Sequence, residues 1–207
     1  MTPDERSVLQ QLGRVGADLA PMLAPAGHDE LLQAITATAR EMFAAGACSL
    51  ALLDEDAGEL VFDVASGGGE IVGTRIPVGH GIAGWVAASG QPIAVDDVRE
   101  DPRFARSVAE DSGYMPRAIV AMPVETEHEV LGVIEILDPG PDMGHELALL
   151  ELFARQAALA ITSQRVLAGL AQLAALVGEL GRLAPVERDA ATRLIDDLLA
   201  SSRTSRR

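Results

Sequence analysis

The sequence predicts an α+β fold built on an antiparallel sheet, and three observations support this class. Segments 47–66 and 117–137 each hold two apolar runs joined by a short polar turn, which is the pattern of a β-hairpin. Apolar residues recur at helical spacing before the first of these segments and after the second. Because a hairpin makes its two strands antiparallel neighbours, this order predicts an antiparallel sheet with helices at both ends of the chain.

Two helices are expected before the first hairpin. Thr2 can cap the first of them, and apolar residues continue at helical spacing as far as Pro21. After the breakers Pro25 and Gly27, a second helix is expected from about Asp29 to Ala45. Its apolar side is predicted to hold Leu31, Leu32, Ile35, Met42 and Phe43.

The middle of the chain holds the two hairpins and a less regular segment between them. The first hairpin turns at the acidic segment 54–58. A further strand is expected at 92–98, followed by a short acidic helix or loop at 101–113. The second hairpin turns around Glu127 and His128, so five strands are identified directly from the pattern.

A single long helix is expected from His145 to Leu180, where the chain has no proline. Apolar residues recur every seventh position at Leu152, Leu159, Val166, Leu173 and Leu180, and the interleaved positions are Leu149, Gln156, Ser163, Leu170 and Val177. This five-heptad seam predicts self-association of the chain, in which the polar Gln156 and Ser163 lower stability and fix register. A second apolar face, Phe153, Ala157, Ala160 and Ile161, is expected to pack on the sheet.

A final helix is expected at 185–200, followed by a basic tail that ends in Arg203, Arg206 and Arg207. Two helices around a short turn are compatible with a helix-turn-helix motif. The second helix carries four acidic residues against two arginines, so it lacks the cationic face that phosphate contacts require. We therefore divide the chain into an N-terminal helix and linker (1–27), a central domain (28–162) and a helical extension (163–207).

The charge balance argues against nucleic acid and anionic membranes as partners. The chain has 31 acidic and 16 basic side chains, which gives a formal net charge of −15. The N-terminus does not match a signal peptide, and nowhere do eighteen apolar residues follow one another. Cys48 is the single cysteine, so an intramolecular disulfide cannot form. A cytoplasmic protein is expected.

The stretch "PVGHGIAGWVAASGQPIAVDDV" (77–98) contains Gly79, Gly81 and Gly84 in the spacing of the dinucleotide fingerprint. That fingerprint requires a strong strand before it, a helix of ten or more residues after it, and a parallel sheet. Here the preceding segment contains Gly73 and Pro77, and the following helix ends after about two turns. We interpret the three glycines as a tight turn into a short helix, and no nucleotide phosphate site is expected.

The phrases "RIPVGHGIAGWVAASGQPIAVDDVREDPRF", "GYMPRAIVAMPV", "EVLGVIEILD" and "LLELFARQAALAI" resemble the GAF domain family, in which such phrases occur in this order. The resemblance covers roughly Asp29 to Ile161. It implies an antiparallel sheet of five or six strands, with the terminal helices on one face. Short helices and loops would form a small-molecule pocket on the other face, and the glycine turn would lie at its rim.

The resemblance also suggests ligands and activities, each of which demands particular residues. Reduction of methionine sulfoxide requires an attacking and a resolving cysteine, and Cys48 is alone. Its apolar strand also favours a buried thiol over a bilin attachment site. The cyclic-nucleotide signature NKFDE is absent, since the chain contains no asparagine. The four histidines are scattered singly, so no metal site is expected and His80 alone lies at the expected rim.

Candidate pocket residues follow from the sheet and rim elements that the resemblance implies. They are Phe62, Val64, Val95, Asp97, Phe104, Val108, Tyr114, Arg117 and Glu135. Each has an alternative role as a core or surface residue, and about half are expected to face a cavity. Asp97 and Arg117 are the polar pair selected for testing.

These observations together predict a non-enzymatic sensory or regulatory module. It would bind a small organic ligand and signal through dimerising N- and C-terminal helices, either directly or to a separate output protein. The alternative is a ligand-free scaffold for dimerisation and partner docking, which would have its sheet face filled by Phe62, Phe104 and Met122. The sequence identifies no cofactor, and an enzyme is disfavoured because no nucleophile and base are paired.

Overall fold

The computed structural model describes residues 26–141 and 146–182. The predicted N-terminal helix, the final helix and the basic tail lie outside these residues. Residues Pro25–Ser163 form one compact unit, and the described part of a second unit is the segment 164–182. The two units are described separately below.

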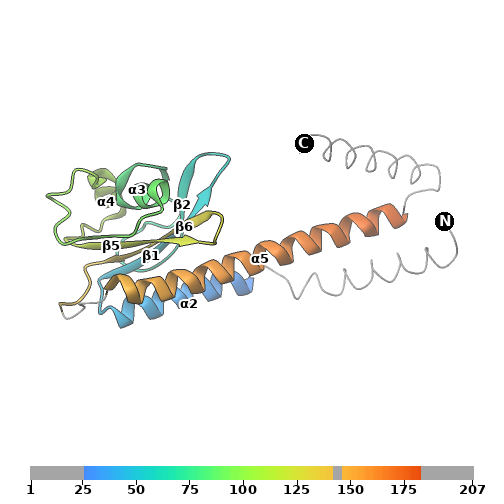
Figure 1. Ribbon diagram of the computed structural model, residues 1–207, viewed down its shortest axis with the longest axis horizontal. Coiled ribbons are helices and arrows are strands. Elements are labelled where there is room, and N and C mark those ends of the chain that lie inside the picture. The colour runs from blue at the N-terminus through green and yellow to red at the C-terminus, as the bar shows by residue number, and fades with distance from the viewer. Residues whose placement is uncertain (1–25, 142–145, 183–207) are drawn as a thin grey trace. The chain divides into compact units, whose positions relative to one another are not determined.

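The compact unit contains a six-stranded antiparallel sheet, as the sequence and the family resemblance predict (Figure 1). The strands are β1 (Ala47–Asp54), β2 (Glu59–Gly67), β3 (Arg75–Pro77), β4 (Ile93–Val95), β5 (Ile119–Glu125) and β6 (Val130–Leu137), in the spatial order β3-β2-β1-β6-β5-β4. The two hairpins therefore supply the four central strands. The edge strand β3 was missed because it has only three residues and lies among glycines.

Two layers of helices cover the two faces of the sheet (Figure 1). Helices α2 (Ala26–Met42) and α5 (Glu146–Arg182) are the long ones, and α2 with the first part of α5 packs on one face. The short helices α3 (Gly81–Ser89) and α4 (Arg106–Ser112) lie on the opposite face. The sheet is thus the shared wall between a core on the long-helix side and a core on the short-helix side.

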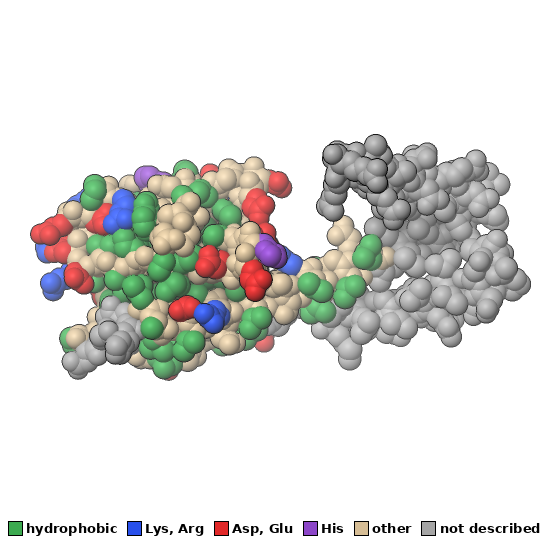
Figure 2. Space-filling view, in the orientation of Figure 1, with side chains coloured by type: hydrophobic (Ala, Val, Ile, Leu, Met, Phe, Trp, Pro, Cys, Tyr) green, Lys and Arg blue, Asp and Glu red, His purple; other side chains and the backbone are tan. Residues whose placement is uncertain are grey.

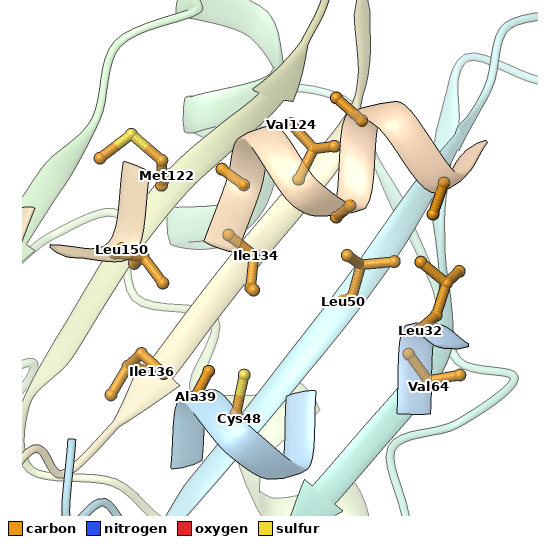
Figure 3. Packing of buried hydrophobic residues seen from close by; sticks show 14 of the residues in the cluster. Leu32, Ala39, Cys48, Leu50, Val64, Met122, Val124, Ile134, Ile136 and Leu150 are labelled. Atoms are coloured by element: carbon orange, nitrogen blue, oxygen red, sulfur yellow. The ribbon is translucent and has the colours of Figure 1, made fainter. Parts of the chain in front are cut away.

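The core on the long-helix side is built from aliphatic residues of the central strands and small residues of the helices. Figure 3 shows Leu50, Ile134 and Ile136 of the sheet pointing toward Leu32 of α2 and Leu150 of α5. All five side chains are fully buried. Alanines at the helix positions facing the sheet let the helices approach it closely.

The buried face of α2 differs from the predicted one. Leu32, Thr36 and Ala39 are fully buried and continue to Phe43 just after the helix, whereas Leu31 and Met42 are half exposed. The buried residues recur at intervals of three or four, as one face of a helix requires, and their small members pack on the sheet. The prediction was wrong for Leu31 and Met42 because it favoured residue size over position.

Helix α5 has the two faces that the sequence predicts. In the compact unit, Ala157 and Ile161 are buried on the sheet, while Leu152 and Leu159 are 58% and 62% exposed. In the segment 164–182, seam residues Val166, Leu170 and Leu173 are also more than half exposed. Gln156 and Ser163, at the interleaved positions of the seam, are exposed as well. Figure 2 shows green hydrophobic side chains on the outer surface of this helix.

The fingerprint glycines form the tight turn that the sequence analysis expected. Gly79 and Gly81 have positive φ angles of 88° and 71°, and the Gly79 N–H donates to the Gly84 carbonyl oxygen at 2.8 Å. A Cβ atom on Gly84 would lie 2.8 Å from the carbonyl oxygen of Pro77. Glycine is therefore required by backbone geometry at all three positions. The antiparallel sheet also rules out the parallel unit that a dinucleotide fold needs.

Candidate functional site

A pocket lies between the sheet and the short helices α3 and α4. It contains about 660 Å³ of space free of atoms, counted out to its opening into solvent. Most of the lining is apolar and comes from Phe62, Ile71, Ile76, Ile82, Phe104, Val108, Ile119 and Leu137. A concave, mostly apolar lining of this kind is typical of small-molecule sites in proteins.

Two polar side chains lie on the floor of this apolar pocket. Glu135 on β6 and Ser49 on β1 are directly opposite each other in the strand register, and both line the pocket. Only 7% of Glu135 and 3% of Ser49 is exposed. Burial raises the pKa of the Glu135 carboxyl to about 7. Among the described residues, no hydrogen bond or ion pair to either side chain is found, which is unusual for buried polar groups.

A hydrogen-bonded corner fixes one edge of the pocket. The Tyr114 hydroxyl donates to Asp138 Oδ2 at 2.7 Å, and the main-chain N–H groups of Arg117 and Ala118 donate to Asp138 Oδ1 at 2.7 and 3.0 Å. Burial and the bond to Asp138 raise the pKa of Tyr114 to about 12, so its hydroxyl remains protonated at neutral pH. Tyr114 is therefore a fixed wall of the pocket.

The same edge includes a glycine run, Gly67 to Gly69, which the sequence analysis did not single out, and a Cβ atom on Gly68 would lie 3.8 Å from the ring of Tyr114. A Cβ atom on Gly69 would lie 1.8 Å from the Ser112 carbonyl oxygen, and one on Gly67 would lie 2.5 Å from the carbonyl oxygen of Gly46. The N–H of Glu70 donates to that Ser112 oxygen at 2.8 Å. The run brings the end of β2 against the end of α4, and three successive glycines after a strand were the available signal.

Five of the nine sequence-predicted residues line the pocket: Phe62, Phe104, Val108, Tyr114 and Glu135. They come from two central strands, the segment around α4 and the connection to β5. The structure thus brings together residues that lie as far apart in the chain as positions 62 and 135. Ser49, Ile82 and the glycine run also line the pocket and were not predicted.

The prediction that Val64 lines the pocket was wrong, because this residue lies on the other face of the sheet. It is buried in the long-helix core, where Figure 3 shows it beside Leu32. In a regular strand Phe62 and Val64 would share a face. The register pairs Leu50 with Val64 and Ala51 with Phe62, so Asp63 is the extra residue of a β-bulge that reverses the alternation.

Val95, Asp97 and Arg117 do not line the pocket either. Val95 packs against the short-helix core from edge strand β4. Asp97 accepts a hydrogen bond from Arg99 Nε at 2.8 Å, and this bond is the main reason that its pKa is lowered to about 2. Arg117 is exposed. Asp97 therefore bonds its near neighbour Arg99 on the surface, and the charge of Arg117 makes a smaller contribution to the lowered pKa of Asp97, so the expected polar pair lies outside the pocket.

Cys48 and His80 do not supply reactive groups to the pocket. The Cys48 side chain points into the long-helix core near Ala39 (Figure 3), and burial raises its pKa to about 12. His80 is exposed at the start of α3. Within the described ranges, no three His, Cys, Asp or Glu side chains are grouped so that they could hold a metal ion. No helix in the same ranges has the length and apolar character needed to span a membrane.

Comparison with known proteins identifies the fold family. The family model "GAF domain" matches residues 27–161. A probable 3',5'-cyclic phosphodiesterase, pde-5, of Caenorhabditis elegans is 30% identical over 111 residues, which cover 48% of this chain and 15% of that protein. The chain thus spans only a small part of this relative.

Two solved structures illustrate the proteins in which the same fold is found. The GAF domain from a phosphoenolpyruvate-protein phosphotransferase of Coxiella burnetii is 23% identical with a TM-score of 0.62, over 78% of this chain and 96% of that one. Free methionine-R-sulfoxide reductase from Neisseria meningitidis is 22% identical with a TM-score of 0.57, over 80% and 95% of the two chains. The chain belongs to the GAF domain family, whose members are small-molecule-binding regulatory modules.

Proposed function

We propose that this chain is a non-enzymatic regulatory module that binds a small organic molecule in the pocket and reports its occupancy through helices α2 and α5. The observation that carries the proposal is the pair Ser49 and Glu135 on the floor of an apolar pocket. Two adjacent buried polar groups without a partner among the described residues cost free energy in the empty protein. A ligand that satisfies both would offset that cost.

The strands that form the pocket floor also contact the long helices. Glu135 faces the pocket, while its neighbours Ile134 and Ile136 are fully buried in the core with Leu150 of α5. A ligand that moves β6 therefore changes the surface on which α5 packs. Signalling then requires that the ligand bind one arrangement of the helices more tightly than another.

The exposed seam of α5 supports self-association as the output of this movement. Leu152 and Leu159 are more than half exposed although they are large and apolar, and they repeat at heptad spacing. A second copy of the chain offers the same seam, and pairing would bury both. We propose a homodimer through this helix, with a separate protein as a further candidate receiver.

An enzymatic role is not proposed, although one structural relative is an enzyme. Thiol-based reduction of a sulfoxide needs a thiolate and a second cysteine. This chain has one cysteine, and the raised pKa of Cys48 keeps it a buried neutral thiol. Among the described residues that line the pocket, Glu135 is the group placed to act as a base for Ser49, but no hydrogen bond joins the two side chains, so the serine is not activated as a nucleophile.

The alternative function, a ligand-free scaffold, required that Phe62, Phe104 and Met122 fill the face of the sheet. Phe62 and Phe104 do line the short-helix side, but they leave a cavity, and Met122 points into the opposite core (Figure 3). The cavity favours ligand binding over a purely structural role.

Native mass spectrometry of the purified full chain tests the proposal. The variant Val108→Trp places a large ring on α4 at the pocket wall, and Glu110→Trp adds the same ring to an exposed position of that helix. We expect a bound small molecule on the wild type and on Glu110→Trp, and its loss from Val108→Trp. A chain that carries no added mass, or one that keeps it in Val108→Trp, would contradict the proposal.

A further inference from the structure

The chemical class of the ligand can be inferred from the groups that face the pocket. Ser49 and Glu135 are neighbours in the β1–β6 register, are each more than nine-tenths buried, and line the same space. The Ser49 hydroxyl can donate one hydrogen bond and accept two, and an ionised carboxylate can only accept. The floor is therefore a place for a ligand group with several N–H or O–H donors.

The charge of the pocket disfavours anionic ligands. None of the described residues that line the pocket is an Arg or a His, so nothing there offsets the charge of Glu135. The whole chain carries a formal charge of −15, which raises the local concentration of cations and repels anions. A buried carboxylate without a partner is costly, and a cation is the partner that stabilises it most.

The remaining lining sets the rest of the ligand. Around the two polar groups lie aromatic and aliphatic side chains, among them Phe62, Phe104 and Ile82. Burial of an apolar group of the ligand against these side chains is favourable, because it removes apolar surface from water. An aromatic or aliphatic group attached to the cationic head fits this lining.

We propose that the pocket binds a small organic cation, a protonated amine with an apolar body, whose nitrogen donates hydrogen bonds to the Glu135 carboxylate and the Ser49 hydroxyl. This inference rests on the proposed function and names the ligand class of the same pocket. In this proposal Glu135 and Ser49 determine the specificity for the amine, and Phe62 and Phe104 contact the apolar body of the ligand.

Binding of such a cation depends on pH through one group. The other titratable residues that line the pocket are Cys48 and Tyr114, and the pKa of each is raised to about 12, so both stay neutral below pH 9. Asp138 lies behind Tyr114 and is held by it, and the lining residues of α3 and α4 do not titrate. With a pKa of about 7, Glu135 must release its proton before the amine binds. The affinity should therefore fall about tenfold per pH unit below 7 and level off above it.

Three probes of nearly the same shape test the charge preference on the full 207-residue chain. They are benzylammonium, neutral benzyl alcohol and anionic benzoate, measured at pH 8 by ligand-observed NMR and isothermal titration calorimetry. We expect benzylammonium to bind at least about tenfold more tightly than either of the others. Equal or tighter binding of benzyl alcohol or benzoate, or no detectable binding of benzylammonium at millimolar concentration, would overturn the inference.

Two glutamine variants test the residue. Glu135→Gln keeps the shape of the side chain and removes its charge, and Glu125→Gln makes the same change at an exposed position of the neighbouring strand. The first should lower the affinity for benzylammonium about tenfold or more and abolish its pH dependence, and the second should leave both unchanged. If Glu135→Gln leaves the affinity for benzylammonium unchanged, the cation is not held by this carboxylate and the inference fails.

The outcomes separate this inference from the proposed function. In one outcome, benzyl alcohol binds equally well to the wild type and to Glu135→Gln but not to Val108→Trp. This result would refute the preference for a cation and would still support a small-molecule pocket. A protein that binds none of the probes and carries no co-purified molecule would refute both.

Discussion

At the scale of single residues, Glu135 couples the stability of the protein to pH. Its pKa rises from an ordinary value of 4.5 to about 7 because burial penalises the charged form. Between these two values the folded chain binds more protons than the unfolded chain, so this group lowers the free energy of unfolding as pH rises. The loss is complete above pH 7 and amounts to about 3 kcal/mol.

Glu135→Gln should remove this loss. The free energy of unfolding is measured by urea denaturation of the variant and the wild type. We expect the value of the variant to rise relative to that of the wild type between pH 4.5 and 7, and to exceed it by about 3 kcal/mol at pH 8. Glu125→Gln is the matched exposed control and should follow the wild type throughout. A constant difference between Glu135→Gln and the wild type across this pH range would show that Glu135 is not a desolvated carboxyl.

The same residues show what a sequence can predict about a site. Glu135 and Phe62 were found because a family resemblance located their strands. Val64 was misplaced because the bulge at Asp63 reverses the faces of β2, and one extra residue leaves no mark on the apolar pattern. Ser49 was missed because a serine in an apolar strand looks like a tolerated core residue until the strand register sets it beside Glu135.

At the scale of elements, the two-faced helix α5 was predictable because both of its faces follow regular spacings. Its sheet-facing alanines and its heptad seam could be separated by counting residues. Strand β3 could not be found this way, since three residues are too few to show alternation and its place is fixed only by pairing with β2. Short edge elements depend on tertiary contacts that a local pattern does not contain.

The seam leads to a prediction about the oligomer. Leu159→Asp puts a charge in the middle of the exposed apolar stripe and should convert a dimer into a monomer, measured by size exclusion with light scattering. Burial of one leucine contributes about 1.5–3 kcal/mol, and each dimer would lose two. Because Leu159 is 62% exposed, the domain itself should keep its thermal stability.

Ala168→Asp is the control for this substitution. It places the same charge on an exposed position of α5 outside the seam, and the protein should remain a dimer. A wild type that is monomeric at tens of micromolar, or a dimer that survives Leu159→Asp, would show that the seam is not a dimer interface.

At the scale of the whole domain, the sheet is a partition with chemistry on one side and helices on the other. Strands β1 and β6 run through its centre and contribute alternate residues to the pocket and to the long-helix core. Close packing on the helix side leaves little space to absorb a shift of these strands. Pocket occupancy and helix arrangement are therefore expected to depend on each other, and the coupling acts in both directions.

Hydrogen–deuterium exchange of the full chain with and without benzylammonium tests this coupling most directly. We expect altered protection of β6 and of the first part of α5, residues 146–163, although none of the described residues of that helix lines the pocket. The same change should be absent in Glu135→Gln. Protection that changes only around α3 and α4, with α5 unaffected at saturating ligand, would contradict the claim that the helices report what the pocket binds.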